Sequence, residues 1–150
     1  MRALFDVNVL IALHDRDHVH HVRTAQWFED HIQNGWATCA LTQNGCLRIM
    51  GQPGYSSPQP MPVLVGMLQN STRTAHHEFW SDEISLLDPL QFQHGHIHSA
   101  RQLTDLYLLA LAVKNKGRLV TLDQRIPISA VHGATSCLLY TSDAADEEDS

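Results

Sequence analysis

The sequence predicts an α/β fold, in which a single domain has a mostly parallel central sheet of four to five strands between layers of helices. Continuous apolar runs at residues 3–5, 36–41 and 118–122 have the pattern of strands that are buried on both faces. Helical patterns separate these runs, and such alternation is typical of parallel sheets. The length of 150 residues suits one domain with one core.

The first strand leads directly into a carboxylate. Residues 3–5 precede Asp6, and a second apolar run at residues 9–13 follows Asn8. We expect a short buried strand with Asp6 at its C-terminal tip, and then a helix capped near Asn8. Functional groups of open α/β sheets gather at the carboxyl ends of the strands. Asp6 is therefore a candidate site residue, and a helix-capping aspartate is the alternative.

The middle of the chain continues with a helix, a strand and a helix. Apolar residues recur at helical spacing over residues 21–34, and Asn34-Gly35 ends that pattern. The strand at residues 36–41 precedes Thr42, which we expect to cap a helix over residues 43–50. Residues 51–62 are rich in Pro, Gly and Ser, and they form a loop that is too short for a domain linker.

The second half contains the clearest helix of the chain. We expect a helix at residues 62–69, a short strand at residues 84–87 and a histidine-rich connection at residues 91–99. The strongest helical pattern covers residues 104–116, with Thr104 as the N-cap, Asp105 in the first turn and Gly117 at the end. The strand at residues 118–122 then delivers Asp123.

The end of the chain differs from the rest. Five of the sixteen acidic residues lie in the last eight positions, so the net charge of −6 belongs mainly to the tail and the body is near neutral. Residues 137–147, CLLYTSDAADE, resemble a sequencing adapter translated in frame. We therefore expect a domain over residues 1–136 and a non-native or disordered acidic tail over residues 137–150, although residues 137–140 are strand-like. A natural acidic tail is the alternative.

Composition narrows the class of protein. The chain has no apolar run long enough for a bilayer and no signal-peptide pattern, so we expect a cytoplasmic protein. The three cysteines lack a CxxC pair and are expected as free, buried thiols, and the three tryptophans are expected in the core. Zinc sites need about four ligands at fixed spacing. The histidine clusters at residues 14–21 and 94–98 lack HExxH or paired cysteines, so exposed loop histidines are the preferred interpretation.

Three carboxylates are predicted to meet in space. Asp6 and Asp123 each end a strand and Asp105 begins a helix, and all of these positions lie at the same edge of a parallel sheet. Clustered carboxylates repel one another unless cations neutralise them, and oxygen ligands favour Mg²⁺ or Mn²⁺. Thr121 could hold one carboxylate through its hydroxyl group. The alternatives are a helix-dipole role for Asp105, a turn role for Asp123 and an ordinary β-branched strand residue for Thr121.

These features together resemble the PIN-domain ribonucleases, and among them the VapC toxins of bacterial toxin–antitoxin pairs. The matching stretches are residues 4–13, 36–49 and 103–126, and the last of these is the most specific. The resemblance implies that Asp6, Asp105 and Asp123 are the catalytic metal ligands. Most PIN domains also carry a glutamate in the helix after the second strand. Here that stretch reads TQNG, as in some VapC-like proteins, and Asn44 is the candidate for the fourth corner.

The resemblance also implies an activity and partners. It points to an endoribonuclease that cuts tRNA or rRNA loops with water activated by Mg²⁺ or Mn²⁺, to inhibition by a VapB-type antitoxin, and to a homodimer. Asn8 is a supporting site residue, and the candidate phosphate contacts are Arg16, Arg23, Arg48 and Arg125. A PIN module that binds RNA or an antitoxin without efficient cleavage is the main alternative, because the glutamate is missing. A phosphatase of the haloacid-dehalogenase type is less consistent, since it requires an Asp where Asn8 stands.

Overall fold

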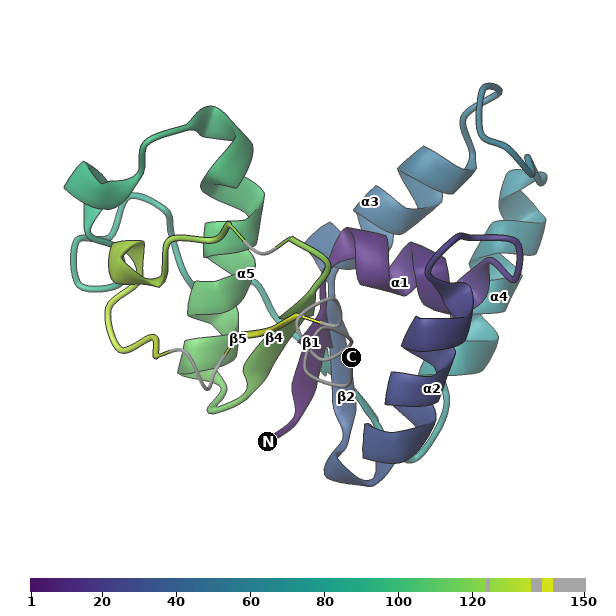
Figure 1. Cartoon of the computed structure of the whole chain (residues 1–150), viewed down its shortest axis with the longest axis horizontal. Coiled ribbons are helices and arrows are strands. Elements are labelled where there is room, and N and C mark those ends of the chain that lie inside the picture. The colour runs from purple at the N-terminus through teal and green to yellow at the C-terminus, as the bar shows by residue number, and fades with distance from the viewer. Residues whose placement is uncertain (124, 136–138, 142–150) are drawn as a thin grey trace, which may run out of the picture.

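The computed structural model describes residues 1–123, 125–135 and 139–141. In this part of the chain the predicted α/β architecture is confirmed, with a parallel sheet between two layers of helices (Figure 1). The predicted acidic tail at residues 137–150 lies outside the described residues, except for residues 139–141. These three form the last strand, which includes part of the strand-like run expected at residues 137–140.

Five strands form the sheet in the order β3-β2-β1-β4-β5, and every neighbouring pair is parallel. Their bounds are β1 Ala3–Phe5, β2 Trp36–Cys39, β3 His77–Trp80, β4 Arg118–Thr121 and β5 Leu139–Thr141. The two central strands pair Phe5 with Val120, so their carboxyl ends lie side by side. This register brings the residues that follow β1 and β4 to one place.

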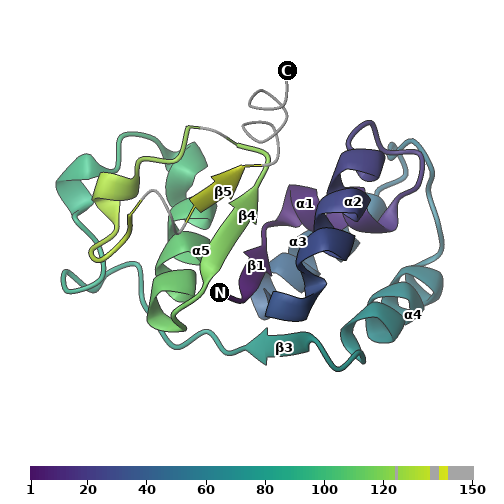
Figure 2. The same cartoon turned by 60° about the horizontal axis from the view of Figure 1, so that its bottom comes forward.

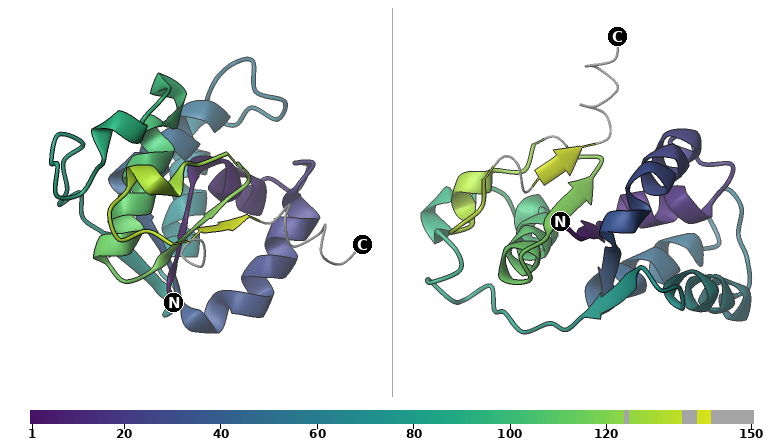
Figure 3. Two further views of the ribbon diagram at one scale, coloured as in Figure 1. Left: turned by 60° about the vertical axis from the view of Figure 1, so that its left-hand side comes forward. Right: turned by 90° about the horizontal axis from the view of Figure 1, so that it is seen from below.

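Helices cover both faces of the sheet. The α-helices are α1 Val7–His14, α2 His21–His31, α3 Ala40–Met50, α4 Met61–Thr72 and α5 Leu103–Lys114. Short 3₁₀ turns lie at Ile32–Asn34, His94–His96, Ala100–Gln102 and Ile128–Ala130. Helix α5 lies on one face, and the other four α-helices lie on the opposite face (Figure 3).

The two faces of the sheet contribute to two separate apolar clusters. Leu4 and Leu119 pack with the buried residues of α5, whereas Phe5 and Val120 pack with α1, α3 and α4. Neighbouring strand residues therefore point to opposite faces, as the pleat requires. Both clusters are buried, which explains why the central strands are largely apolar, with Ala3–Phe5 apolar throughout and Leu119 and Val120 apolar in β4.

Strand β3 was predicted in the wrong place. The apolar run at residues 84–87 is a loop, and the strand is the more polar stretch His77–Trp80. It pairs with β2 in register, from Trp36–His77 to Cys39–Trp80. An edge strand needs backbone pairing on one side only, and of its four side chains only Trp80 is buried, so it lacks the apolar pattern of a central strand. Figure 2 shows β3 at the edge of the sheet, with a long connection leading away toward α5.

Two predicted helix caps also differ. Helix α3 begins at Ala40, and Thr42 is its third residue, where its hydroxyl oxygen accepts a hydrogen bond from the Cys39 backbone nitrogen at 3.0 Å. Helix α5 begins at Leu103 directly after the 3₁₀ turn, so Thr104 lies inside the first helical turn. Threonine is a residue type that favours the N-cap, but both threonines follow residues that already have helical geometry.

The cysteine and tryptophan predictions are confirmed for the described residues. Cys39 and Cys46 are free and buried, whereas Cys137 lies outside the described residues. Trp27, Trp36 and Trp80 are buried in the two clusters. None of the described helices combines the length and apolar character that a membrane span requires.

Candidate active site

Asp6 lies between the first strand and the first helix. Its backbone nitrogen donates to the carbonyl oxygen of Val120 at 3.1 Å, which extends the pairing of the two central strands. Its carboxylate oxygen Oδ1 accepts a hydrogen bond from the Val9 backbone nitrogen at 2.9 Å, so Asp6 is the N-cap of α1. The cap predicted near Asn8 is therefore wrong, because Asn8 lies inside the first turn and is exposed. Asp6 both caps the helix and lies at the expected sheet edge.

Thr121 contacts Asp6 from the neighbouring strand. As the last residue of β4, it is fully buried, and its hydroxyl group donates to Oδ2 of Asp6. The same hydroxyl oxygen accepts a hydrogen bond from the backbone nitrogen of Asp123 at 3.0 Å. One side chain thus links the two aspartates that follow β1 and β4.

The third carboxylate belongs to the opposite helical layer. Asp105 is the third residue of α5 and is half-buried, while Asp123 is exposed in the turn after β4. Oδ1 of Asp123 accepts a hydrogen bond from the backbone nitrogen of Arg125 at 2.9 Å, which fixes that turn. The three carboxylates come from three separate parts of the chain.

Electrostatics shows that these carboxylates influence one another. Burial raises the pKa of Asp6 to about 7, with a further contribution from the charge of Asp105, while the hydrogen bonds from Thr121 and Val9 act in the opposite direction. Burial, and then the charge of Asp123, raises the pKa of Asp105 to about 6. Asp105 is therefore coupled to Asp6 on one side and to Asp123 on the other. Raised pKa values in coupled carboxylates are typical of functional sites.

The donor chemistry fits a hard divalent cation. The three side chains offer only carboxylate oxygens, and none of the effects that set the pKa values of Asp6 and Asp105 comes from a positively charged residue. Among the described residues, no three His, Cys, Asp or Glu side chains already stand in an arrangement that could hold a metal ion. The repulsion is the observation that favours a cation, because a bound ion would offset it.

Residues 42–45 lie at the same sheet edge, in the first turns of α3, which follows β2. Gln43 donates to the hydroxyl of Thr38 at 3.0 Å, so it points back to β2, whereas Asn44 is exposed. Gly45 packs against α1 so closely that a Cβ atom there would lie 2.6 Å from Cγ2 of Val7. This contact packs the first turns of α3 closely against the helix that Asp6 caps.

A pocket of about 550 Å³ opens beside Asp123. Its polar lining consists of Asn8, Ser99, Arg101, Gln102, Asp123 and Arg125. Of the arginines predicted to contact phosphate, only Arg125 lines this pocket. Arg16 lies in the loop after α1, Arg48 is exposed on α3, and Arg23 bonds to His20.

Sequence reasoning missed Ser99, Arg101 and Gln102. They belong to the turn that leads into α5, and the predicted helix began after them, at Thr104. Their position just before the helix that carries Asp105 was the available signal. Residues directly preceding such a helix reach the same sheet edge as its first turn.

The histidines of the first cluster are engaged in structural contacts. Nδ1 of His14 lies 2.8 Å from the Leu10 carbonyl oxygen, and Nε2 lies 2.7 Å from the Ser71 hydroxyl. Nδ1 of His21 lies 2.7 Å from the Ala12 carbonyl oxygen. Both side chains are partly buried, so the interpretation of the whole cluster as exposed loop residues is wrong for these two.

Comparison with known proteins identifies related chains. The PIN domain family model matches residues 3–131. Ribonuclease VapC44 of Mycobacterium tuberculosis is 51% identical over 141 residues, which cover 94% of this chain and 99% of that protein. Ribonuclease VapC39 of the same organism is 37% identical over 139 residues, which cover 92% of this chain and 100% of that protein.

A solved structure shares the fold. It is the crystal structure of VapBC2 from Rickettsia felis bound to a DNA fragment from their promoter, and one of its chains matches with a TM-score of 0.60. The match covers 94% of this chain and 98% of the other, at 15% sequence identity. At that identity the likeness concerns the fold alone.

Proposed function

The chain belongs to the PIN-domain family, and from that premise we propose that it is the ribonuclease toxin of a VapBC-type toxin–antitoxin pair, which hydrolyses phosphodiester bonds within RNA. The observation that carries the proposal is the coupling of three carboxylates at one sheet edge, in which Asp105 interacts electrostatically with both Asp6 and Asp123. The names of the relatives VapC44 and VapC39 support the class of reaction.

The proposed cofactor is Mg²⁺ or Mn²⁺, held by Asp6, Asp105 and Asp123. When bound, such an ion would lower the pKa of a coordinated water for attack on phosphorus and offset charge on the leaving oxygen. Asn44 would supply a neutral amide oxygen in place of the usual carboxylate. With one negative charge fewer, the site is expected to hold the cation less tightly than a site with four acids.

The surrounding residues keep the carboxylates in position. Thr121 holds Oδ2 of Asp6 from β4, and the Val9 backbone holds Oδ1 from α1. Both oxygens therefore have a fixed orientation before any ligand binds, and such preorganisation makes a polar site effective. Asn8 and Arg125 line the adjacent pocket, where they would contact the RNA.

The proposed substrate is a single-stranded loop of a structured RNA, with tRNA and rRNA as the candidate molecules. Unpaired bases are accessible to proteins, whereas the deep major groove of an RNA helix is not. The proposed partner is a VapB-type antitoxin whose C-terminal segment lies across the acidic edge, and the proposed assembly is a homodimer. Co-expression with the product of the neighbouring gene tests the antitoxin, because it should relieve toxicity and co-purify with the chain.

The direct test is cleavage of RNA by the purified chain with Mn²⁺ or with EDTA. We expect cleavage with Mn²⁺, none with EDTA and none with Asp6→Asn. The matched control is Glu29→Gln, which neutralises an exposed acid on α2 and should leave cleavage unchanged. Equal cleavage by the wild type and Asp6→Asn would contradict the assignment of Asp6.

A second candidate function is favoured by Asn44, because the resemblance to PIN domains implies a glutamate in this helix and the chain has none at residues 42–45. In that case the chain binds RNA or an antitoxin without efficient cleavage. If the wild type and Asp6→Asn both fail to cut RNA at saturating Mn²⁺ but both bind the antitoxin, this function replaces the first.

A further inference from the structure

The pocket beside Asp123 has the size and lining of a ligand site. Its volume of about 550 Å³ lies within the range of small-molecule sites, which is roughly 300–1,000 Å³. The lining is mostly polar, and the metal ligands proposed above contribute only Asp123 to it. The pocket therefore extends away from the three carboxylates and leaves room for a group next to the reacting one.

Two arginines give this pocket its positive charge. Arg101 and Arg125 are exposed and line it from different segments, before α5 and after β4 respectively. Both of the ion pairs found among the described residues, Arg2–Glu78 and Lys114–Glu83, involve other side chains. The two guanidinium groups are thus available to an anion.

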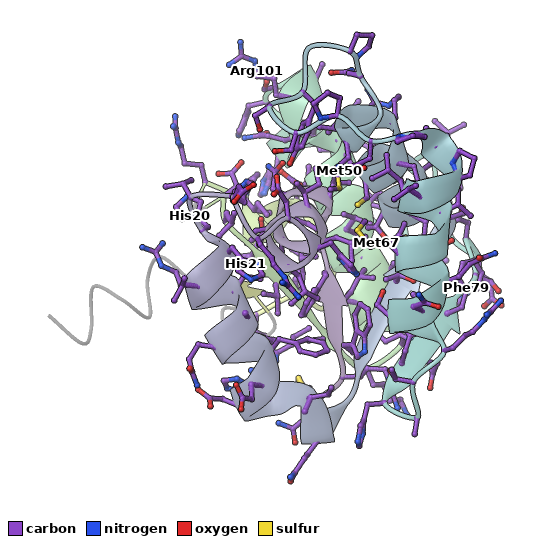
Figure 4. The ribbon with its side chains drawn as sticks, turned by 90° about the vertical axis from the view of Figure 1, so that its right-hand side faces the viewer. His20, His21, Met50, Met67, Phe79 and Arg101 are labelled. Carbon is purple, nitrogen blue, oxygen red and sulfur yellow. The ribbon has the colours of Figure 1, made fainter. Side chains whose placement is uncertain are left out.

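The backbone on which each arginine stands is anchored. The Arg101 backbone nitrogen donates to the Ser99 hydroxyl at 3.2 Å, and the Arg125 backbone nitrogen donates to the Asp123 carboxylate at 2.9 Å. Figure 4 shows Arg101 near the top of the molecule, above α1, and Figure 1, which has the same vertical axis, shows β1 running upward into α1. Both arginines therefore belong to the same end of the sheet as the acidic cluster.

An RNA strand needs positive charge at this place. Its phosphates are repelled by the carboxylates, and a bound cation would offset that repulsion only at the scissile phosphate. Guanidinium groups bind phosphate with paired hydrogen bonds, and their charge does not titrate. The phosphate next to the scissile one would lie beside the three carboxylates, and the pocket lies at that position.

We propose that this pocket is the subsite for the nucleotide that flanks the cleaved bond, and that Arg101 and Arg125 bind its phosphate. The assignment rests on the proposed ribonuclease function. Ser99, Gln102 and Asn8 supply the neutral hydrogen-bonding groups that face the same pocket, and they suit a ribose hydroxyl or a base edge. Arg101 then contributes to RNA binding and to the choice of the cleavage position.

The test measures RNA binding in an Asp6→Asn background, with oligonucleotides that each carry one uncharged methylphosphonate linkage. The variants are Arg101→Gln, Arg101→Lys and Arg125→Gln. The matched control is Arg73→Gln, since Arg73 is an exposed arginine at the C-terminal end of α4, remote in the chain from the pocket residues. Thermal unfolding checks that each variant is folded.

We expect one linkage next to the cleaved bond at which the neutral substitution weakens binding about tenfold in the parent and in Arg73→Gln. The same substitution should have a clearly smaller effect in Arg101→Gln and in Arg125→Gln, because each variant has lost one of the two contacts to that phosphate, and an intermediate effect in Arg101→Lys. The slope of log affinity against log salt should also fall by about 0.7 for each lost phosphate contact to single-stranded RNA.

Equal penalties at every linkage in the parent and in Arg101→Gln would overturn the subsite. If the wild type cleaves RNA while this pattern is absent, the subsite is wrong and the ribonuclease function stands. If the wild type neither binds nor cleaves RNA, both fall together.

Discussion

Thr121 and Asp6 are joined side chain to side chain across the two central strands, with the hydroxyl group of Thr121 donating to Oδ2 of Asp6. Both residues are buried, at 0% and 3% exposure. The Thr121 hydroxyl oxygen also accepts a hydrogen bond from the Asp123 backbone nitrogen at 3.0 Å. The positions of two carboxylates at neighbouring strand ends therefore depend on one hydroxyl group.

Thr121→Val tests this dependence, because valine keeps the shape and removes the hydroxyl. We expect a loss of about 1–3 kcal/mol in the free energy of unfolding, since buried polar groups lose their partners. The pKa of Asp6 should rise, because the lost hydrogen bond favoured the charged form. Cleavage should fall at least about tenfold, with its pH profile displaced to higher pH. Thr121→Ser should restore both the profile and most of the rate, and an unchanged pH profile in Thr121→Val would argue against a positioning role.

The stability of the metal-free protein should decrease as pH rises. Because the pKa of Asp6 is about 7 in the folded protein against 3.8 for the free side chain, the folded state binds the proton more tightly than the unfolded chain. The contribution of Asp6 to the free energy of unfolding is therefore largest below about pH 4, and it is lost as the pH rises to about 7. The full difference is on the order of 4 kcal/mol. The raised pKa of Asp105 likewise makes the protein less stable as the pH rises from about 4 to about 6.

Thermal unfolding in EDTA between pH 4 and pH 8 measures this slope. Asp6→Asn should flatten it, because the amide does not titrate. Mn²⁺ should raise the Tm of the wild type more at pH 8 than at pH 5, since it binds the ionised carboxylates. A Tm that responds equally to Mn²⁺ in the wild type and in Asp6→Asn would show that the ion binds elsewhere.

Asn44→Glu should strengthen metal binding. Adding a fourth carboxylate at the start of α3 is expected to raise Mn²⁺ affinity about tenfold and to lower the stability of the metal-free protein through added repulsion. Asn44→Gln is the matched control, because it has the size of glutamate without the charge. Titration calorimetry compares the three proteins. Equal Mn²⁺ affinity in the Glu and Gln variants would place residue 44 outside the metal site.

Much of the fold follows from the sequence because its central strands are buried on both faces. The continuous apolar runs around Leu4 and Leu119 identify them, and the following Asp6 and Asp123 mark the functional edge. Strand β3 could not be found in this way, since pairing with β2 rather than an apolar pattern determines its position. Tertiary pairing thus overrides local propensity at the edge of the sheet.

Of the residues in the candidate site, the acidic ones were those that the sequence predicts. The convergence of Asp6, Asp105 and Asp123 follows from the rule that strand ends and helix starts share an edge. The signal for Arg101 was weaker, namely its position just before α5, because the turn that places it at this edge lies outside the helix that the sequence predicts. The sequence leaves the cap of α1 open between a position near Asn8 and Asp6, since both residue types favour that position, and the structure has Asp6 there.

Gly45 is expected to control the distance between α3 and α1. In Gly45→Ala the new Cβ atom would lie 2.6 Å from Cγ2 and 3.2 Å from Cγ1 of Val7. Valine has little rotamer freedom in a helix, so the helices must move apart. Such overpacking costs about 1–3 kcal/mol, which exceeds the gain in helix propensity of about 1 kcal/mol. The displacement would also carry Asn44 away from the helix that Asp6 caps.

Gly66→Ala is the matched control, because a Cβ atom at that position of α4 has no neighbour within 4 Å. This variant should be as stable as the wild type or up to about 1 kcal/mol more stable. Val7→Ala should rescue Gly45→Ala, since it removes both clashing methyl groups, and the double-mutant cycle should give a favourable coupling of at least about 1 kcal/mol. Denaturant unfolding and RNA cleavage measure the two effects on the same samples. Additive losses in the double variant would mean that α3 is held in place by contacts other than the one between Gly45 and Val7.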